Sequence, residues 1–371
     1  MILSKKIRLK PDKTQESLLC KSTGTARFIY NWTLGRQKEN YESGGKFLSD
    51  NVLRKEITQL KKSELEWLSQ VSNNVAKQAI KDACDSYKKF FRKQSAFPKF
   101  KSKKKAKPSF YNDTEKLKVK DNLVLLEKVG WVKTSEQIPM DTKYSNPRIS
   151  FDGKYWYISV GMDIEKLEVE LTGKSVGIDL GIKDLAVCST GKIYKNINKT
   201  KRVKKLKKTL KRLQKQVSRK YYKNKGGENR YHKSQNILKL EQKLRLIHRR
   251  ISNIRSNNLH QITNEIVKTK PSKIVMEDLN VKGMMKNRHL SKAIAEQNFH
   301  RFTTVMKYKC EFNGIEFVQV PRFYPSGKKC SKCGEIKKNL KLSDRVFQCE
   351  CGHVMDRDLN ASINLANYRV S

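Results

Sequence analysis

Residues 330–365 read CSKCGEIKKNLKLSDRVFQCECGHVMDRDLNASINL, a stretch that joins a cysteine cluster to a pair of aspartates. Cys330 and Cys333 form a CxxC pair, and Cys349 and Cys351 form a CxC pair; a glycine follows each pair. A glycine at these positions allows a tight turn, so the four thiolates can converge on one cation. The spacing predicts a zinc ribbon whose zinc is structural, because four thiolates leave no position open for water.

The cysteines also allow other interpretations. Two disulfides would require an oxidising compartment, which nothing else in the sequence indicates. The CxC pair is one residue shorter than the usual CxxC, so His353 could replace Cys349 as a ligand, although a solvent-exposed histidine beside a turn is the simpler interpretation. The other cysteines are interpreted as small core residues in apolar surroundings: Cys20, Cys84, Cys188 and Cys310.

The charge of the chain is strongly positive. Its 371 residues include 81 Lys and Arg against 36 Asp and Glu, a formal charge of +45. No fold requires this excess, so a polyanionic partner, nucleic acid, is expected. An acidic membrane surface is the alternative, but the sequence has no run of 18 apolar residues, and its start MILSKKIRLK becomes charged too early for a signal peptide. We expect an intracellular protein without membrane contact.

Three acidic residues follow segments that resemble buried elements. Asp179 ends the strand-like run SVGID, Glu277 ends KIVME, and Asp356 or Asp358 follows the cysteine cluster. Each alone could simply cap a helix or end a strand. In so basic a protein the three together indicate a divalent-metal site, because clustered carboxylates repel each other without Mg²⁺ or Mn²⁺. Two such ions about 3.5–4 Å apart can activate water and stabilise the leaving oxygen of a phosphodiester.

The sequence favours Asp358 over Asp356 as the metal ligand. Apolar residues recur after it at helical spacing, at Leu359, Ile363 and Ala366. A helix starting at or just after Asp358 would place that carboxylate at the positive end of the helix dipole and keep it ionised. For Asp356 we expect an ion pair with Arg357 or a turn-stabilising bond.

Residues 201–255 form the most basic region, with 21 Lys and Arg against two Glu. Apolar residues at spacings of three and four on both sides of YYKNKGGEN predict two long helices in a hairpin. The apolar stripes are interpreted as core seams. A solvated helix face usually mixes charge signs, so charge of one sign favours a phosphate-binding surface. Its proposed contacts include Lys204, Lys205, Lys207, Lys208, Arg249 and Arg250.

The amino-terminal half combines strands and helices. Residues 1–10 alternate like a strand, and helical patterns follow, including one at residues 71–91. After the basic linker FPKFKSKKKAKPSF, residues 115–163 are strand-rich, with Asp152-Gly153 as a hairpin turn. This pattern predicts a helical block inserted in, or beside, a small β domain.

The segment GIDLG also occurs in the phosphate loop of actin, sugar-kinase and Hsp70-type ATPases. Such an ATPase needs a second glycine-rich phosphate loop and an adenosine loop. Neither is found, because the 18 glycines are dispersed and no later DxG-type strand turn occurs.

The ordered motifs GIDLGIKDLAV, IVMEDL, PSGKKCSKCG and CGHVMDRDLNASINL are similar to those of the TnpB (OrfB) proteins of bacterial insertion sequences, compact relatives of type V CRISPR effectors. The resemblance implies an α+β multidomain protein with a RuvC-type, RNase H-like nuclease core. The implied domains are a β-barrel-like, oligonucleotide-binding-like wedge domain (1–10 and 104–170), a helical recognition domain (11–103), the nuclease domain (171–325 and 352–371) and an inserted zinc ribbon (326–351).

The resemblance further implies an RNA-guided DNA endonuclease that loads a guide RNA from the end of its own element and cleaves duplex DNA beside a short adjacent motif. Asp179, Glu277 and Asp358 would be catalytic, with Mg²⁺ or Mn²⁺, and Asn73 and Lys77 would face the duplex groove, where their side-chain types can read base edges. We expect a monomer in the bacterial cytoplasm, associated with the nucleoid when bound to DNA. The alternative is a non-cleaving guided regulator of transposition or transcription. For the nuclease, Asp358→Asn should abolish cleavage but not guided DNA binding, whereas Asp356→Asn should mainly weaken folding or rate.

Overall fold

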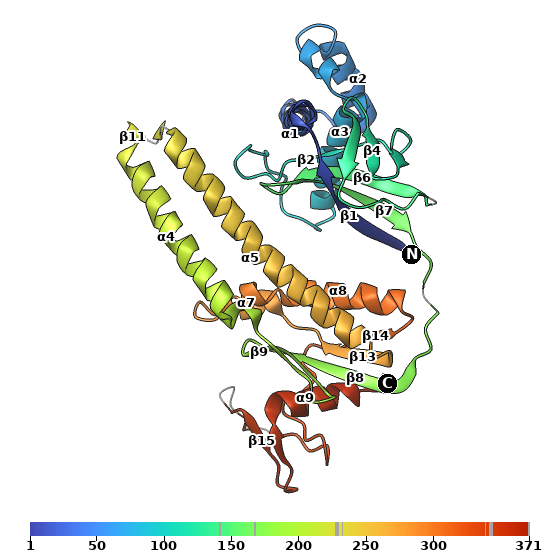
Figure 1. Ribbon diagram of the computed structural model, residues 1–371, viewed down its shortest axis with the longest axis vertical. Helices are drawn as coiled ribbons and strands as arrows, with labels where there is room; N and C mark the ends of the chain where they lie inside the picture. Colours follow the sequence, from blue (N-terminus) through green and yellow to red (C-terminus); the bar gives the residue numbers. More distant parts are fainter. Residues whose placement is uncertain are drawn as a thin grey trace. The chain divides into compact units, whose positions relative to one another are not determined.

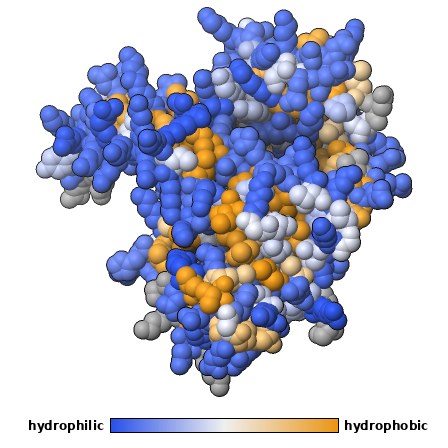
Figure 2. Space-filling view, turned by 60° about the horizontal axis from the view of Figure 1, so that its bottom comes forward, coloured by the Kyte–Doolittle hydropathy of each residue, from blue (hydrophilic) through white to orange (hydrophobic). Residues whose placement is uncertain are grey.

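The computed structural model describes residues 1–140, 142–166, 168–226, 230–231, 233–337, 339–340 and 344–369 (Figure 1). The chain divides into two compact units, Met1–Ile164 and Glu165–Ser371. Within the described residues, no helix combines the length and apolar character that crossing a membrane requires. Hydrophilic residues cover most of the face shown in Figure 2, as the charge of the sequence predicts.

Unit 1 contains a seven-stranded antiparallel sheet with the strand order β2-β6-β7-β1-β5-β4-β3. Its strands are β1 (Ile2–Lys10), β2 (Ser109–Tyr111), β3 (Lys118–Lys120), β4 (Leu123–Leu126), β5 (Gly130–Thr134), β6 (Tyr144–Phe151) and β7 (Trp156–Asp163). β1 pairs with β7 and β5, so the first strand of the chain lies inside the sheet. Among the described residues, no pairing joins the edge strands β2 and β3 into a closed barrel.

The helices of unit 1 are inserted between β1 and β2. They are α1 (Lys13–Glu42), α2 (Asp50–Leu60), the 3₁₀ helix η1 (Glu66–Gln70) and α3 (Asn73–Phe91). Asp12 begins α1 by accepting a hydrogen bond from the Gln15 amide, the capping arrangement typical of such starts. A paired guanidinium and carboxylate, Arg148 on β6 and Asp82 on α3 at 2.6 Å, join the helices to the sheet.

Unit 2 is built on a mixed five-stranded sheet with the order β10-β9-β8-β13-β14. The strands are β8 (Thr172–Leu180), β9 (Asp184–Cys188), β10 (Ile193–Lys195), β13 (Pro271–Glu277) and β14 (Glu316–Val320). β8, β9 and β10 are antiparallel neighbours, whereas β13 is parallel to both β8 and β14. The parallel strands therefore end at the same edge of the sheet.

Helices cover both faces of this sheet. One face packs on α5 (Gln235–Val267), α7 (Ser291–Gln297) and α8 (Phe299–Phe312) through an apolar core that includes Ile178 and Phe302. The other face packs on α9 (Arg357–Ala366), where Val275, Val320 and Leu365 meet. A short helix, α6 (Val281–Met284), follows β13, and the 3₁₀ helix η2 (Ile197–Lys199) follows β10.

Two hairpins extend from unit 2. α4 (Lys201–Lys223) and α5 form a long helical hairpin, with the short strands β11 (Lys225–Gly226) and β12 (Arg230–Tyr231) near its tip. β15 (Val346–Gln348) and β16 (Val354–Asp356) form a β-hairpin that carries Cys349 and Cys351 in its turn and leads directly into α9. Figure 1 shows the helical hairpin in yellow-green (α4) and gold (α5) and the β-hairpin in red.

Several sequence predictions agree with these elements. The helical hairpin is present, and the Asp152-Gly153 turn joins β6 to β7, with Gly153 at a φ of 93°. The second strand of the cysteine hairpin extends to Asp356, past the expected ribbon boundary at 351. Residues 338 and 341–343 of the expected ribbon lie outside the described residues. Cys20 was expected in the core but is exposed, because it lies on the outer face of α1.

Candidate functional site

Asp179, Glu277 and Asp358 meet on the face of the second sheet that packs on α9. Val275 and Gly177 are paired in the parallel register of β13 and β8, and both contact α9. Side chains alternate along a strand, so the residues two positions later, Asp179 and Glu277, point to the same face. Asp358 lies in the first turn of α9, one turn before the residues that contact Gly177.

The close approach of α9 to β8 depends on Gly177. A Cβ atom at this position would lie 1.9 Å from the Ser362 carbonyl oxygen and 2.4 Å from the Ala366 amide nitrogen. No side chain fits at such distances, so the helix can approach the strand only over a glycine. This contact positions the first turn of α9, and with it Asp358, relative to the sheet.

The three carboxyls lie in an environment that disfavours their charged forms. The pKa of Asp179 is raised well above its ordinary value, first by its removal from water and then by the negative charges of Glu277 and Asp358. Removal from water also raises the pKa of Glu277, whereas a hydrogen bond from the Ser326 hydroxyl lowers it by a smaller amount. The pKa of Asp358 is raised for the same reason, and Arg345, at 3.8 Å, opposes the shift. A cation between these groups would relieve both the repulsion and the cost of burial.

Asp356 has a structural role. Its carboxylate accepts hydrogen bonds from the amides of Asp358 at 2.9 Å and Leu359 at 3.1 Å, so it caps the amino terminus of α9. The helix begins at Arg357, one residue before the expected start. Asp356 therefore holds the turn that carries Asp358.

The four ribbon cysteines lie close together. The ligand atoms of Cys330, Cys333, Cys349 and Cys351 all lie within 4.8 Å of one another. Amide hydrogen bonds close each turn, from Gly334 to Cys330 and from Gly352 to Cys349, and both glycines have the positive φ expected there. The set of four sulfur donors suits zinc. His353 is not part of this group; its Nε2 atom lies 3.2 Å from the Ser331 hydroxyl.

The carboxyls are more loosely arranged than the thiols. Among the residues that the structure describes, no comparably tight group of possible metal ligands includes Asp179, Glu277 or Asp358. All three are half-buried and supply only oxygen atoms, the donors preferred by Mg²⁺ and Mn²⁺. The residues present therefore fit a hard divalent cation.

Two asparagines of α9 bind the ribbon to the carboxylate centre, and sequence reasoning did not assign them this role. Asn360 donates to the Lys329 carbonyl at 2.7 Å and accepts from the Ser331 amide at 3.0 Å. Asn364 donates to the carbonyls of Ser326 at 2.8 Å and Lys329 at 2.6 Å. Both are buried, and their spacing of four residues on one helix face could have indicated a shared partner.

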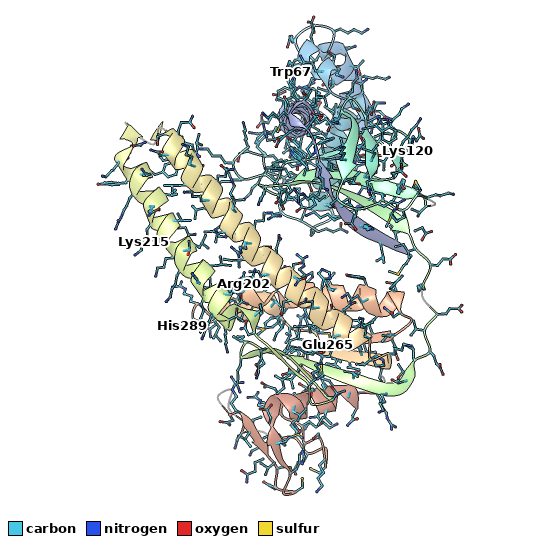
Figure 3. The ribbon with its side chains drawn as sticks, in the orientation of Figure 1. Trp67, Lys120, Arg202, Lys215, Glu265 and His289 are labelled. Carbon is cyan, nitrogen blue, oxygen red and sulfur yellow. The ribbon has the colours of Figure 1, made fainter. Side chains whose placement is uncertain are left out.

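The basic residues proposed for nucleic acid differ in their availability. Lys204, Lys205 and Lys208 are exposed on α4. Figure 3 shows basic side chains along this helix, with Arg202 and Lys215 labelled. Lys207 is less available, since its ammonium pairs at 2.5 Å with Glu296 of α7, which also binds Arg255 of α5 at 3.3 Å. Lys207 thus fixes the base of the hairpin.

The other proposed contacts are also placed. Arg250 is exposed on α5, whereas Arg249 is half-buried and has a partner within the protein. In unit 1, Asn73 and Lys77 are exposed one turn apart on the first half of α3. Asn73 accepts a hydrogen bond from Lys61, so its amide is held in place on the protein surface.

Comparison with known proteins identifies the family. Family models described as "Probable transposase" and "Cas12f1-like, TNB domain" match residues 158–288 and 299–365. InsQ of Escherichia coli (strain K12), whose name classes it provisionally as an RNA-guided DNA endonuclease, is 30% identical over 97% of this chain and 90% of its own. A Streptomyces pristinaespiralis protein with the same provisional description is 30% identical over 97% of this chain and 87% of its own. The chain belongs to the TnpB (OrfB) family.

Solved structures show the same fold at low sequence identity. A protein in a Cas12f1–sgRNA–target DNA complex is similar with a TM-score of 0.59 and 16% identity, over 95% of this chain and 82% of that one. The mini-RNA-guided endonuclease CRISPR-Cas_phi3 is similar with a TM-score of 0.51 and 11% identity, over 99% and 92% of the two chains. A third family model, described as a helix-turn-helix domain, matches residues 1–46, which here form β1 and the single long helix α1.

Proposed function

We propose that this TnpB family member is an RNA-guided DNA endonuclease of the RuvC type. The observation that carries the proposal is that Asp179, Glu277 and Asp358 lie on neighbouring elements at one sheet face, where the charges of Glu277 and Asp358 act on Asp179. The family membership and the names of the relatives support it. The mixed sheet, with carboxyls at the ends of neighbouring parallel strands, is compatible with an RNase H-like core.

In this proposal the chain's own residues orient the reacting groups. Asp179 and Glu277 are fixed by the register of β8 and β13, and Asp358 by the capped first turn of α9. Ser326 donates a hydrogen bond to Glu277 and holds one carboxylate oxygen in a defined direction. Bound Mg²⁺ or Mn²⁺ would activate water and stabilise the leaving oxygen of the phosphodiester. The four cysteines would hold zinc. Asn360 and Asn364 would hold α9 in a fixed position against the ribbon through their hydrogen bonds.

The same proposal assigns guide RNA to the basic hairpin. Lys204, Lys205 and Lys208 lie exposed on α4, in a region with 21 Lys and Arg against two Glu. Replacing these three lysines with glutamine should weaken RNA binding and reduce the slope of log affinity against log salt by about two to three. Lys207→Gln should instead lower the melting temperature, because Glu296 loses an ion-pair partner. A salt slope unchanged by the triple substitution would contradict the assignment.

Recognition of the adjacent DNA motif is proposed for Asn73 and Lys77. Their exposure on one face of α3 would allow both to enter a groove, where an asparagine amide can read an adenine edge. Substitution of both should change which motif permits cleavage. Equal losses on every motif would instead indicate phosphate contacts.

The proposed function is tested by purifying the protein with its cellular RNA and sequencing that RNA. The complex, given Mg²⁺ and a duplex that matches the RNA beside each possible short motif, should cut only matched DNA. Cleavage should disappear after ribonuclease treatment and return with added RNA. Guided binding without any cutting would favour a non-cleaving regulator of transposition or transcription.

A further inference from the structure

Phe323 is the most exposed of the large hydrophobic residues that the structure describes. Its side chain is 91% exposed, in the loop between β14 and the ribbon. Water disfavours an exposed phenyl ring, and unit 2 has an apolar core in which Phe299 and Phe302 are buried. Single exposed hydrophobic residues are common on protein surfaces, so the significance of Phe323 depends on how its neighbours hold it.

The backbone on both sides of Phe323 is anchored beside the carboxylate centre. The Tyr324 amide donates to the Pro321 carbonyl at 2.9 Å, which closes a tight turn with Phe323 inside it. The Arg322 guanidinium pairs at 2.7 Å with Asp278, the residue directly after Glu277. The loop that presents the ring is therefore tied to the strand end that carries Glu277.

The carboxy-terminal side of the turn is held equally well. The Tyr324 hydroxyl donates to the Asn364 carbonyl of α9 at 3.3 Å, and its ring packs edge-on against Tyr368 at 5.1 Å. Ser326, two residues further, donates to Glu277 itself. Fixed neighbours on both sides leave the phenyl ring as the exposed member of an ordered loop, so little order has to be gained when it binds a ligand.

We propose that Phe323 is a stacking site for an unpaired nucleobase of the DNA strand that enters the carboxylate centre. The inference rests on the proposed function, because pairing of a guide with one DNA strand displaces the other as a single strand with open base faces. Every base has such a face, so an aromatic ring holds a strand without regard to sequence. Lys328, exposed in the same loop, can accompany the ring with a phosphate contact. A second copy of this chain is a poorer partner, because the copies carry +45 charges each.

Phe323→Ala tests the site in the RNA-loaded complex. Because stacking on an aromatic ring changes affinity by about 5- to 150-fold per base, we expect single-turnover cleavage of subsaturating target to slow by about tenfold. A DNA in which one nucleotide near the cut is abasic should slow the native complex by a similar factor, at one position only. In the Phe323→Ala complex, the abasic nucleotide at that position should cause no further decrease in the cleavage rate. Phe323→Trp should restore both the cleavage rate and its decrease on abasic substitution.

A matched control and a binding assay separate this inference from the proposed function. Trp131, an exposed aromatic residue of unit 1, should show no coupling to the abasic position when it is replaced by alanine. In an Asp358→Asn background, where no cleavage is needed, Phe323→Ala should still weaken binding of a single-stranded oligonucleotide by about tenfold. The stacking site is refuted if the rate decreases caused by Phe323→Ala and by the abasic nucleotide multiply at every position tested. It is also refuted if Phe323→Leu restores the cleavage rate as fully as Phe323→Trp. A change in the mass of the complex with Phe323→Ala would assign the ring to a protein interface instead.

Discussion

Unit 2 contains two candidate metal centres that are assembled in opposite ways. The ribbon takes its four sulfurs from two local turns within residues 330–351, and the sulfurs lie within 4.8 Å of one another. The carboxylate centre takes its side chains from β8, β13 and α9, which lie far apart in the sequence, and the carboxyls form no group as tight among the described residues. The first centre is specified by spacing, and the second by the whole fold of the sheet.

The two centres should also differ in whether they fold without metal. Cys333, Cys349 and Cys351 lie at least partly exposed on short turns, so the ribbon should depend on zinc to fold. The carboxyls lie on a sheet that is stabilised by its own core, and burial raises the pKa of both Asp179 and Glu277, which lowers the cost of leaving them without a cation. Zinc should therefore control folding of its centre, whereas Mg²⁺ should affect chemistry with little effect on the fold.

Removal of zinc should lower the stability of the protein more than removal of Mg²⁺. Zinc contributes on the order of 10 kcal/mol to small zinc domains, so a zinc-selective chelator should unfold the ribbon and lower the melting temperature of unit 2. Cleavage should then fall by at least about 100-fold even in excess Mg²⁺, because Asn360 and Asn364 lose their partners in the ribbon loop. Calorimetry and a cleavage assay measure both effects. An unchanged melting temperature after verified loss of zinc would remove the ribbon from this account.

Gly177→Ala should damage the carboxylate centre without touching any ligand. Its Cβ would overlap the backbone of α9, and overpacking of this kind costs about 1–3 kcal/mol. We expect cleavage to fall by about 100-fold, because the turn that carries Asp358 must shift. Gly173→Ala, on the same strand with nothing within 4 Å, is the matched control and should be nearly neutral. Equal activity of the two variants would show that the approach of α9 is unimportant.

The dependence of stability on pH should identify the carboxylate centre in the absence of metal. The folded state raises the pKa of Asp179, so it retains that proton to higher pH than the unfolded chain does. The free energy of unfolding should therefore fall as the pH rises from about 4 through the raised pKa of Asp179. Asp179→Asn should weaken this decrease, and Mg²⁺ should oppose it in the native protein only. Urea unfolding at several pH values measures the slope; the same slope in both proteins would contradict the assigned environment.

Local sequence patterns predict more of the cysteine centre than of the carboxylate centre. The cysteine spacing alone indicates a four-sulfur site, because short turns determine which atoms converge. Asp179 and Glu277 could be found as acids that end strands, but only the family resemblance indicated that their strands are neighbours. The register of β8 and β13 and the contact at Gly177 are properties of the folded sheet, which no local pattern contains.

The basic hairpin shows a related limit. Its two helices follow from apolar periodicity, and its excess charge follows from a count. The sequence does not show which lysines remain free of ion pairs within the protein. Lys207 and Lys208 are adjacent, but only Lys207 pairs with Glu296 on α7. Similarly, Asp356 and Asp358 differ by two positions. Helix phase and the family resemblance favour Asp358 as the candidate ligand, but for Asp356 the sequence predicts an ion pair or a turn-stabilising bond, and the structure shows the helix cap.

The central claim is that Asp179, Glu277 and Asp358 form the cleavage centre, and Asp358→Asn in the RNA-loaded complex tests it most directly. Target binding and single-turnover cleavage would be measured in Mg²⁺, with Asp356→Asn as the neighbouring control. We expect Asp358→Asn to bind target within about twofold of the native complex but to cut at least about 10³-fold more slowly, a loss of about 4 kcal/mol of transition-state stabilisation. Asp356→Asn should retain most activity, because asparagine caps a helix about as well as aspartate. Full cleavage by the Asp358 variant, or a well-folded but inactive Asp356 variant beside an active Asp358 variant, would contradict the account.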